Sequence, residues 1–326
     1  MRGLLPAALL TIGLALGLTP AALAQDPHAL RAACIGELKH TLDEAASPAM
    51  LDLCERAVAA NPKNAELKSW LAAALLRSGE GARAWDFFRA AAEAGDPEAQ
   101  KTLGLMHLRR QGDASDHAEA LRWLRAVAEA GDSEAQNLVG TMYLNGVGVA
   151  LDAEEAARWL HRAAERGNRD AQANLAFMYW KGVGIEADPA AALALFREAA
   201  ERGSPVAQAA LGGLYMQGEA VVRDAAEAAR WLRLSAEQGW PQAQNNLGML
   251  YLGGIGVERD PVLAEQWIRR AAQAGHPNAQ DNLGLLYEEG LGLPQDKALA
   301  LEWYRRAAEQ GHPGAAESVL RLGGSL

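Results

Sequence analysis

Side chains able to carry out chemistry are few in this chain, and their spacing does not assemble an active site. None of the seven histidines lies four residues from another, the spacing that puts two imidazoles on one face of a zinc-binding helix. No nucleophile elbow, phosphate loop or dinucleotide fingerprint occurs. We interpret neighbouring carboxylates, such as Glu154 with Glu155 and Glu288 with Glu289, as solvated rather than as general acid–base pairs. We therefore expect no enzymatic activity, no metal ion and no cofactor.

The two cysteines, Cys34 and Cys54, are the remaining reactive side chains. Their midpoint falls in residues 43–48, Asp-Glu-Ala-Ala-Ser-Pro, which are typical of a turn between two helices. Residues equidistant from the turn of a helical hairpin face each other, so the spacing predicts a Cys34–Cys54 disulfide. The alternative is a pair of buried free thiols.

The first 24 residues predict export from the cytoplasm. Arg2 supplies a positive charge, residues 4–18 are apolar, and Ala22-Leu23-Ala24 places small residues at −3 and −1 of a cleavage site before Gln25. The alternative is a membrane anchor, but an apolar run of roughly 15 residues is short for a span of ~20. We expect a periplasmic or secreted protein, in a compartment where a disulfide persists, without a membrane span after cleavage.

An excess of acidic residues argues against two classes of partner. The chain has 31 Lys and Arg against 41 Asp and Glu, and removal of residues 1–24 deletes only Arg2, which leaves a net charge of −11. Such a chain repels a phosphate backbone and an anionic membrane surface on average. We therefore expect no nucleic-acid partner. The low aromatic content, 6%, favours packed helices over sheets.

The chain repeats with a period of 36 residues, and we call each set of positions related by that period a slot. Three of these slots hold Gln100, Gln136, Gln172, Gln208, Gln244 and Gln280; Asp116, Asp152, Asp188, Asp224, Asp260 and Asp296; and Tyr143, Tyr179, Tyr215, Tyr251 and Tyr287. A tryptophan slot holds Trp123, Trp159, Trp231, Trp267 and Trp303, which we expect in the core. Repetition at this length is the signature of a solenoid.

Each period predicts two helices. In one unit the first helix is expected from about Arg169 to Lys181, ended by Gly182-Val183-Gly184. Asp188-Pro189 is typical of an N-cap followed by proline at the first helical position of the second helix. His276 and His312 fall in the slot that precedes a first helix, and we interpret them as turn residues. One helical pair cannot bury its apolar surface alone, so neighbouring pairs are expected to stack.

The segment from Ala243 to Asp260, followed by Trp267 and Gly275, closely resembles the Sel1-like repeat. The resemblance covers residues 99–314 as six units. It implies an all-α, right-handed superhelical solenoid related to tetratricopeptide repeats, and adaptor roles in assembling other proteins. Ala220 departs from the pattern, because it replaces the second turn glycine of its unit.

The remaining segments complete the expected domain organisation. Residues 1–24 form the signal peptide, residues 25–62 a hairpin cap, residues 63–98 a tetratricopeptide-like helical pair, and residues 315–326 a capping helix and tail.

The residues that break the period are the most informative about binding. We expect the first helices to line an inner wall, where one slot holds Leu105, Thr141, Phe177, Gly213, Met249 and Leu285, and another holds Leu108, Leu144, Trp180, Met216, Leu252 and Glu288. Large exposed apolar patches mark binding sites, and aromatic side chains dominate interface hot spots. The alternative is that close packing of successive first helices buries these slots. The predicted partner-binding residues are Thr141, Leu144, Phe177, Trp180, Met216, Asn245, Met249 and Leu252.

These observations predict a non-catalytic scaffold that binds a protein segment in the cell envelope. The resemblance to the Sel1-like repeat implies a role in regulating an envelope sensor or in an export assembly. A second hypothesis is a protein that binds or modifies cell-wall glycan or peptidoglycan, and self-association through the apolar slots is a third. Trp240, in a slot that is otherwise polar, is expected either to pack onto the following helix or to face a partner.

Overall fold

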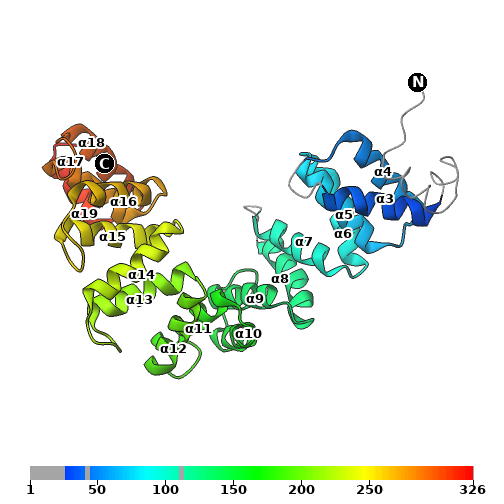
Figure 1. Ribbon diagram of the computed structural model, residues 1–326, viewed down its shortest axis with the longest axis horizontal. Coiled ribbons are helices and arrows are strands. Elements are labelled where there is room, and N and C mark those ends of the chain that lie inside the picture. The colour runs from blue at the N-terminus through cyan, green and yellow to red at the C-terminus, as the bar shows by residue number, and fades with distance from the viewer. Residues whose placement is uncertain (1–25, 41–44, 110–113, 326) are drawn as a thin grey trace. The chain divides into compact units, whose positions relative to one another are not determined.

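The computed structural model describes residues 26–40, 45–109 and 114–325. Within these ranges every regular element is an α-helix, and consecutive helices contact each other as pairs, which confirms the all-α solenoid (Figure 1). The expected signal peptide lies outside the described residues. The chain divides into two compact units, Met1–Asp152 and Ala153–Leu326, which we call the N-terminal and C-terminal units.

The helices of each unit are short and of similar length. The N-terminal unit contains α3 (Pro27–His40), α4 (Pro48–Ala60), α5 (Ala65–Arg77), α6 (Gly81–Glu93), α7 (Pro97–Arg109), α8 (Ala114–Glu129) and α9 (Ser133–Asn145). The C-terminal unit contains α10 (Ala153–Glu165), α11 (Arg169–Lys181), α12 (Pro189–Glu201), α13 (Pro205–Gln217), α14 (Ala225–Glu237), α15 (Pro241–Gly253), α16 (Pro261–Gln273), α17 (Pro277–Glu289), α18 (Lys297–Glu309) and α19 (Pro313–Arg321).

Periodic residues set the ends of these helices. The Asp188 carboxylate accepts hydrogen bonds from the backbone N–H groups of Ala190 and Ala191, both at 3.0 Å, and so caps α12. Gly182 ends α11 with a φ of 66°, and Gly184 follows with a φ of 69°. A side chain at Gly184 would place its Cβ 2.3 Å from the carbonyl oxygen of Ala153, so the turn packs too closely on α10 for any larger residue.

Two histidines also cap helices, a role that the interpretation as turn residues did not specify. His276 Nδ1 accepts from the backbone N–H of Ala279 at 3.3 Å, and His312 Nδ1 accepts from that of Ala315 at 3.2 Å. The Nε2 atom of His276 lies 2.9 Å from the Gln242 side-chain oxygen. Burial lowers the pKa of His276, which favours the neutral ring that this acceptor role requires.

The glutamine slot joins one hairpin to the next. Gln208 Nε2 donates to the carbonyl oxygen of Ala200 at 3.1 Å, across the turn between α12 and α13, and its Oε1 accepts from Gln238 Nε2 at 2.8 Å. Gln136, Gln244 and Gln280 make the same bond to the carbonyl eight residues earlier. These side chains are buried, and each gives a second donor to a helix-end carbonyl that already accepts from the backbone N–H of the turn glycine.

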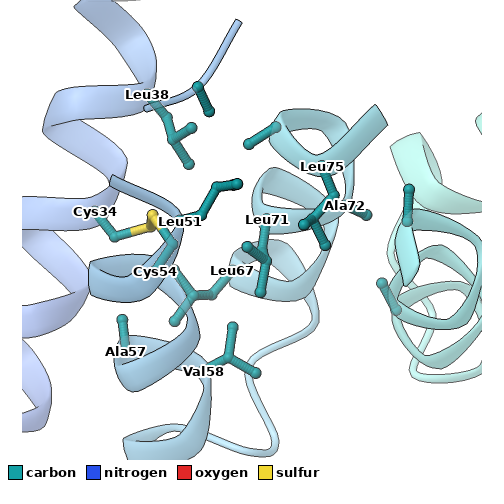
Figure 2. Packing of buried hydrophobic residues seen from close by; sticks show 14 of the residues in the cluster. Cys34, Leu38, Leu51, Cys54, Ala57, Val58, Leu67, Leu71, Ala72 and Leu75 are labelled. Carbon is teal, nitrogen blue, oxygen red and sulfur yellow. A yellow bond between two sulfur atoms is a disulfide. The ribbon is translucent and has the colours of Figure 1, made fainter. Parts of the chain in front are cut away.

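The core of the N-terminal unit surrounds the two cysteines (Figure 2). Cys34 on α3 and Cys54 on α4 form a disulfide with a Cα–Cα distance of 5.0 Å, and neither side chain is accessible to solvent. Leu51 from α4 and Leu67 and Leu71 from α5 lie beside it in the same cluster. The disulfide therefore fixes α3 to α4 within the first hairpin, and apolar packing joins this hairpin to α5.

Four tryptophans of the periodic slot, Trp123, Trp159, Trp231 and Trp303, are buried as expected, and Trp267 is half-buried. An arginine guanidinium lies over each of the five rings, at 4.2 to 4.9 Å from the centroid. Each tryptophan thus closes the edge of a hairpin core beneath a cationic side chain.

Candidate partner-binding surface

The first helices of the C-terminal unit carry an exposed apolar row. Phe177 on α11, Met249 on α15 and Leu285 on α17 have exposed fractions of 41%, 37% and 38%. The Phe177 ring is held by an edge-to-face contact with Phe196, with 4.9 Å between centroids. Between Phe177 and Met249 in this slot is Gly213 on α13, where an added Cβ would meet nothing within 4 Å. We call Phe177, Gly213, Met249 and Leu285 the exposed row.

The second apolar slot lies deeper. Trp180, Met216 and Leu252 are half-buried, and each packs against a core cluster that contains residues of its own hairpin and of the following one. Both alternatives, a binding surface and packing between repeats, therefore occur in the C-terminal unit, each in a different slot. The slot of Trp180 contributes to packing between repeats, and the slot of Phe177 leaves apolar side chains accessible.

Asn245 lies behind this surface rather than on it. Only 5% of the residue is exposed, and its side-chain oxygen accepts a hydrogen bond from Asn282 Nδ2 at 2.8 Å. The bond joins α15 to α17, so Asn245 connects successive first helices. Asn246, beside it, accepts from Gln242 Nε2 at 3.0 Å.

The two predicted residues of the N-terminal unit are on α9. Thr141 and Leu144 are both half-buried, and the Thr141 hydroxyl donates to the carbonyl oxygen of Leu138 at 2.8 Å. That bond is local to the helix and uses the hydroxyl hydrogen of Thr141.

Glu288 has a role that the sequence did not reveal. It is the only acid in its otherwise apolar slot, and only 7% of the residue is exposed. The Tyr304 hydroxyl donates to Glu288 Oε2 at 2.9 Å, Arg321 Nη2 donates to the same atom at 2.8 Å, and Arg321 Nη1 donates to Oε1. The Arg321 hydrogen bonds are the main cause that lowers the pKa of Glu288, while burial raises the pKa of Tyr304. This cluster attaches α19 to α17 and α18.

Trp240 stands at the N-cap of α15 with 37% of the residue exposed, and its side chain makes no capping hydrogen bond.

In the part of the chain that the structure describes, no three His, Cys, Asp or Glu side chains group closely enough to hold a metal ion. None of the described helices combines the length and apolar character that crossing a bilayer requires.

The chain matches the family model of the Sel1 repeat in residues 81–96, 97–132, 133–168, 169–204, 205–240, 241–276 and 277–312. The first of these segments is short and falls in the pair that we expected to be tetratricopeptide-like. The six full matches share the expected period, with a frame that begins at residue 97 instead of 99.

Solved structures give the same relationship. A protective antigen of uropathogenic Escherichia coli strains that displays an SLR fold is 33% identical, with a TM-score of 0.65; the aligned region covers 83% of this chain and 59% of the antigen, so the chain spans less than two thirds of that protein. A Sel1 repeat protein from Oxalobacter formigenes is also 33% identical, with a TM-score of 0.59 and coverage of 68% and 86%.

Yeast Tom70 shares the fold at 14% identity, with a TM-score of 0.52 and coverage of 84% of this chain and 58% of Tom70. No curated protein matches the sequence. The family model spans most of the chain, and its repeats coincide with the helical pairs of the structure. This chain therefore belongs to the Sel1 repeat family.

Proposed function

We propose that this chain is a non-catalytic scaffold of the bacterial cell envelope that binds a protein segment across the exposed row of its C-terminal unit. Sel1 and tetratricopeptide-like repeats generally mediate protein–protein interaction, which supports the general class. The observation that carries the proposal is the exposure of Phe177, Met249 and Leu285 in one slot on α11, α15 and α17. Large accessible side chains that recur on one face provide anchors for an apolar partner.

The spacing of the row favours a partner with regularly spaced apolar residues. Packed helices lie about 8–10 Å apart, so neighbouring positions of the row recur at about that interval. An α-helix advances about 10.5 Å in seven residues, and an extended strand advances about 10 Å in three. A helix with apolar residues every seven positions, or a strand with one every third, would meet successive anchors.

A charge-introducing pair of substitutions tests the surface. Phe177→Asp with Met249→Asp places two carboxylates on the row and should weaken partner binding by at least about tenfold, because a buried unpaired charge opposes docking. Val222→Asp with Val262→Asp is the matched control, since those valines are also exposed in the same unit, at 87% and 55%, and lie outside the row. The measurement is quantitative co-purification from envelope extract, followed by the Kd of the purified partner. Equal binding by both double variants would remove the row from the interface.

The location is tested separately. We expect N-terminal sequencing of the protein recovered from the envelope fraction to begin at Gln25, the residue after the proposed cleavage site. Recovery of uncleaved chain from the cytoplasm would contradict the location without bearing on the binding surface.

A further inference from the structure

A periodic arginine–tyrosine pair spans the groove between successive hairpins. Arg233 on α14 donates to the Tyr251 hydroxyl on α15 at 2.7 Å, and Arg269 on α16 donates to the Tyr287 hydroxyl on α17 at 2.9 Å. Each guanidinium also lies over the ring of its tyrosine, at 6.0 and 5.5 Å from the centroid. The partners are 18 residues apart, so the same pair of slots can be followed through the other repeats.

In the N-terminal unit the corresponding residues are Arg89 and His107, where histidine replaces the tyrosine. The structure has a cavity of about 290 Å³ at this position, between α6, α7 and α8. Its walls include His107, Trp85 and Trp123. The cavity therefore coincides with a break in a regular contact.

His107 presents an unused hydrogen-bond acceptor to this cavity. The residue is 9% exposed, its ring meets Trp85 edge-to-face at 4.8 Å, and its Nδ1 lies 3.0 Å from a carboxylate oxygen of Asp116. A carboxylate can only accept, so Nδ1 carries a hydrogen, and in the neutral ring Nε2 has a free lone pair. Nε2 has no hydrogen-bond partner among the described residues. This acceptor on the cavity wall is available to a donor from a ligand.

The charged residues at the cavity are already balanced. Arg89 pairs with Glu93 at 3.5 Å, and Arg122 pairs with Glu119 at 3.1 Å. Arg122 also covers the face of Trp123 at 4.3 Å, so that face is not open to a ligand cation. With two ion pairs complete in themselves, neither an anionic nor a cationic ligand is required. Carboxylate and guanidinium groups can still accept from and donate to hydroxyl groups.

We propose that this cavity binds one neutral sugar ring, whose hydroxyl group donates to His107 Nε2. The remaining hydroxyls bond to the charged pairs that line this mainly polar cavity. A volume of about 290 Å³ is at the small end of ligand pockets, which limits the ligand to a monosaccharide or the terminal unit of a chain. The site is separate from the exposed row and does not depend on the proposed function.

The C-terminal unit offers a matched control. There His161 replaces the arginine of the pair, opposite Tyr179, and a cavity of about 430 Å³ again opens. His161 is exposed, however, and its Nε2 lies 3.2 Å from the Glu165 carboxylate. It therefore lacks the enclosed, unpartnered acceptor that distinguishes His107.

The test is titration calorimetry of the full chain, without its first 24 residues, with glucose, N-acetylglucosamine and the β-1,4-linked tetramer of N-acetylglucosamine. We expect at least one monosaccharide to bind with a Kd of about 1 mM or tighter, and the tetramer to bind through one end. His107→Tyr introduces the Arg–Tyr pair seen at Arg233–Tyr251 and Arg269–Tyr287, fills the cavity and should weaken binding at least about tenfold. His161→Arg should leave binding unchanged, as should Phe177→Asp.

His107→Phe provides a second variant, because it removes the acceptor without adding a hydroxyl; melting by circular dichroism verifies that each variant is folded. Absence of binding by the wild-type chain up to about 20 mM sugar would overturn the proposal. So would binding by His107→Tyr and His107→Phe that is as tight as binding by the wild-type chain. Loss of binding in Phe177→Asp alone would move the sugar to the exposed row and would overturn it equally.

Discussion

Replacing Ala220 with glycine should stabilise the C-terminal unit, because this alanine occupies a turn position that its counterparts reserve for glycine. Ala220 has a φ of 57°, the single positive value among the described non-glycine residues. Gly184, Gly256 and Gly292 hold the same slot with φ of 69°, 70° and 77°. At those glycines an added Cβ would approach backbone atoms of the preceding hairpin to between 2.0 and 2.3 Å. The Cβ of Ala220 must therefore be accommodated by a local shift.

The magnitude follows from two opposing effects. The left-handed conformation costs an L-residue roughly 1–2 kcal/mol, which glycine does not incur. Glycine in turn loses more freedom on folding, by about 0.4–1 kcal/mol relative to alanine. We therefore expect Ala220→Gly to raise the free energy of unfolding by about 0.5–1 kcal/mol. The increase is larger where glycine also removes the local backbone shift that the Ala220 Cβ imposes.

Urea denaturation monitored by circular dichroism measures this difference, with the slope checked for two-state behaviour because solenoids unfold in segments. Ala194→Gly is the control, since Ala194 is an exposed position inside α12, where the same change should cost about 1 kcal/mol. The two substitutions thus have opposite expected signs. A destabilised Ala220→Gly protein would refute the argument from backbone strain.

Three further predictions concern contacts that hold helices in place. Asp188→Ala removes the side chain that caps α12 and should lower the free energy of unfolding by about 1 kcal/mol in urea titrations, whereas Asp188→Asn should retain most of it. Cys34→Ser should cost the N-terminal unit about 3 kcal/mol, and dithiothreitol should lower the melting temperature of the wild-type chain but not that of the variant. The pKa of Glu288 is lowered in the folded chain, chiefly by Arg321, so its contribution to stability is complete above its unfolded pKa of about 4.3 and is lost as the pH falls through the lower folded value. Glu288→Gln should therefore show a smaller loss of stability on acidification than the wild-type chain, and identical slopes of denaturation midpoint against pH would contradict the assignment.

Much of this fold could be predicted from the sequence because the determining interactions are local. The turn glycines, the capping aspartates and the 3.6-residue spacing of apolar positions fix where helices begin and end. The 36-residue period then requires each hairpin to pack in the same way on the next. The expected helix from Arg169 to Lys181 coincides with α11 for this reason.

The candidate site could be predicted only in part, because the exposure of a helix face depends on how closely the neighbouring helix approaches. Phe177 and Trp180 are three residues apart on α11, yet the first is exposed and the second packs against the next hairpin. Asn245 is buried by its hydrogen bond to Asn282, 37 residues later, which no local pattern indicates.

The sequence by itself determined the repeat, the helical hairpins and the family, since these rest on contacts within one or two units of the period. Only the tertiary structure decided which apolar slot faces solvent, that Glu288 binds Arg321, and that His107 lines a cavity between α6, α7 and α8. The physical reason is that burial and pairing are properties of side chains brought together from different helices, and small differences in side-chain volume decide them.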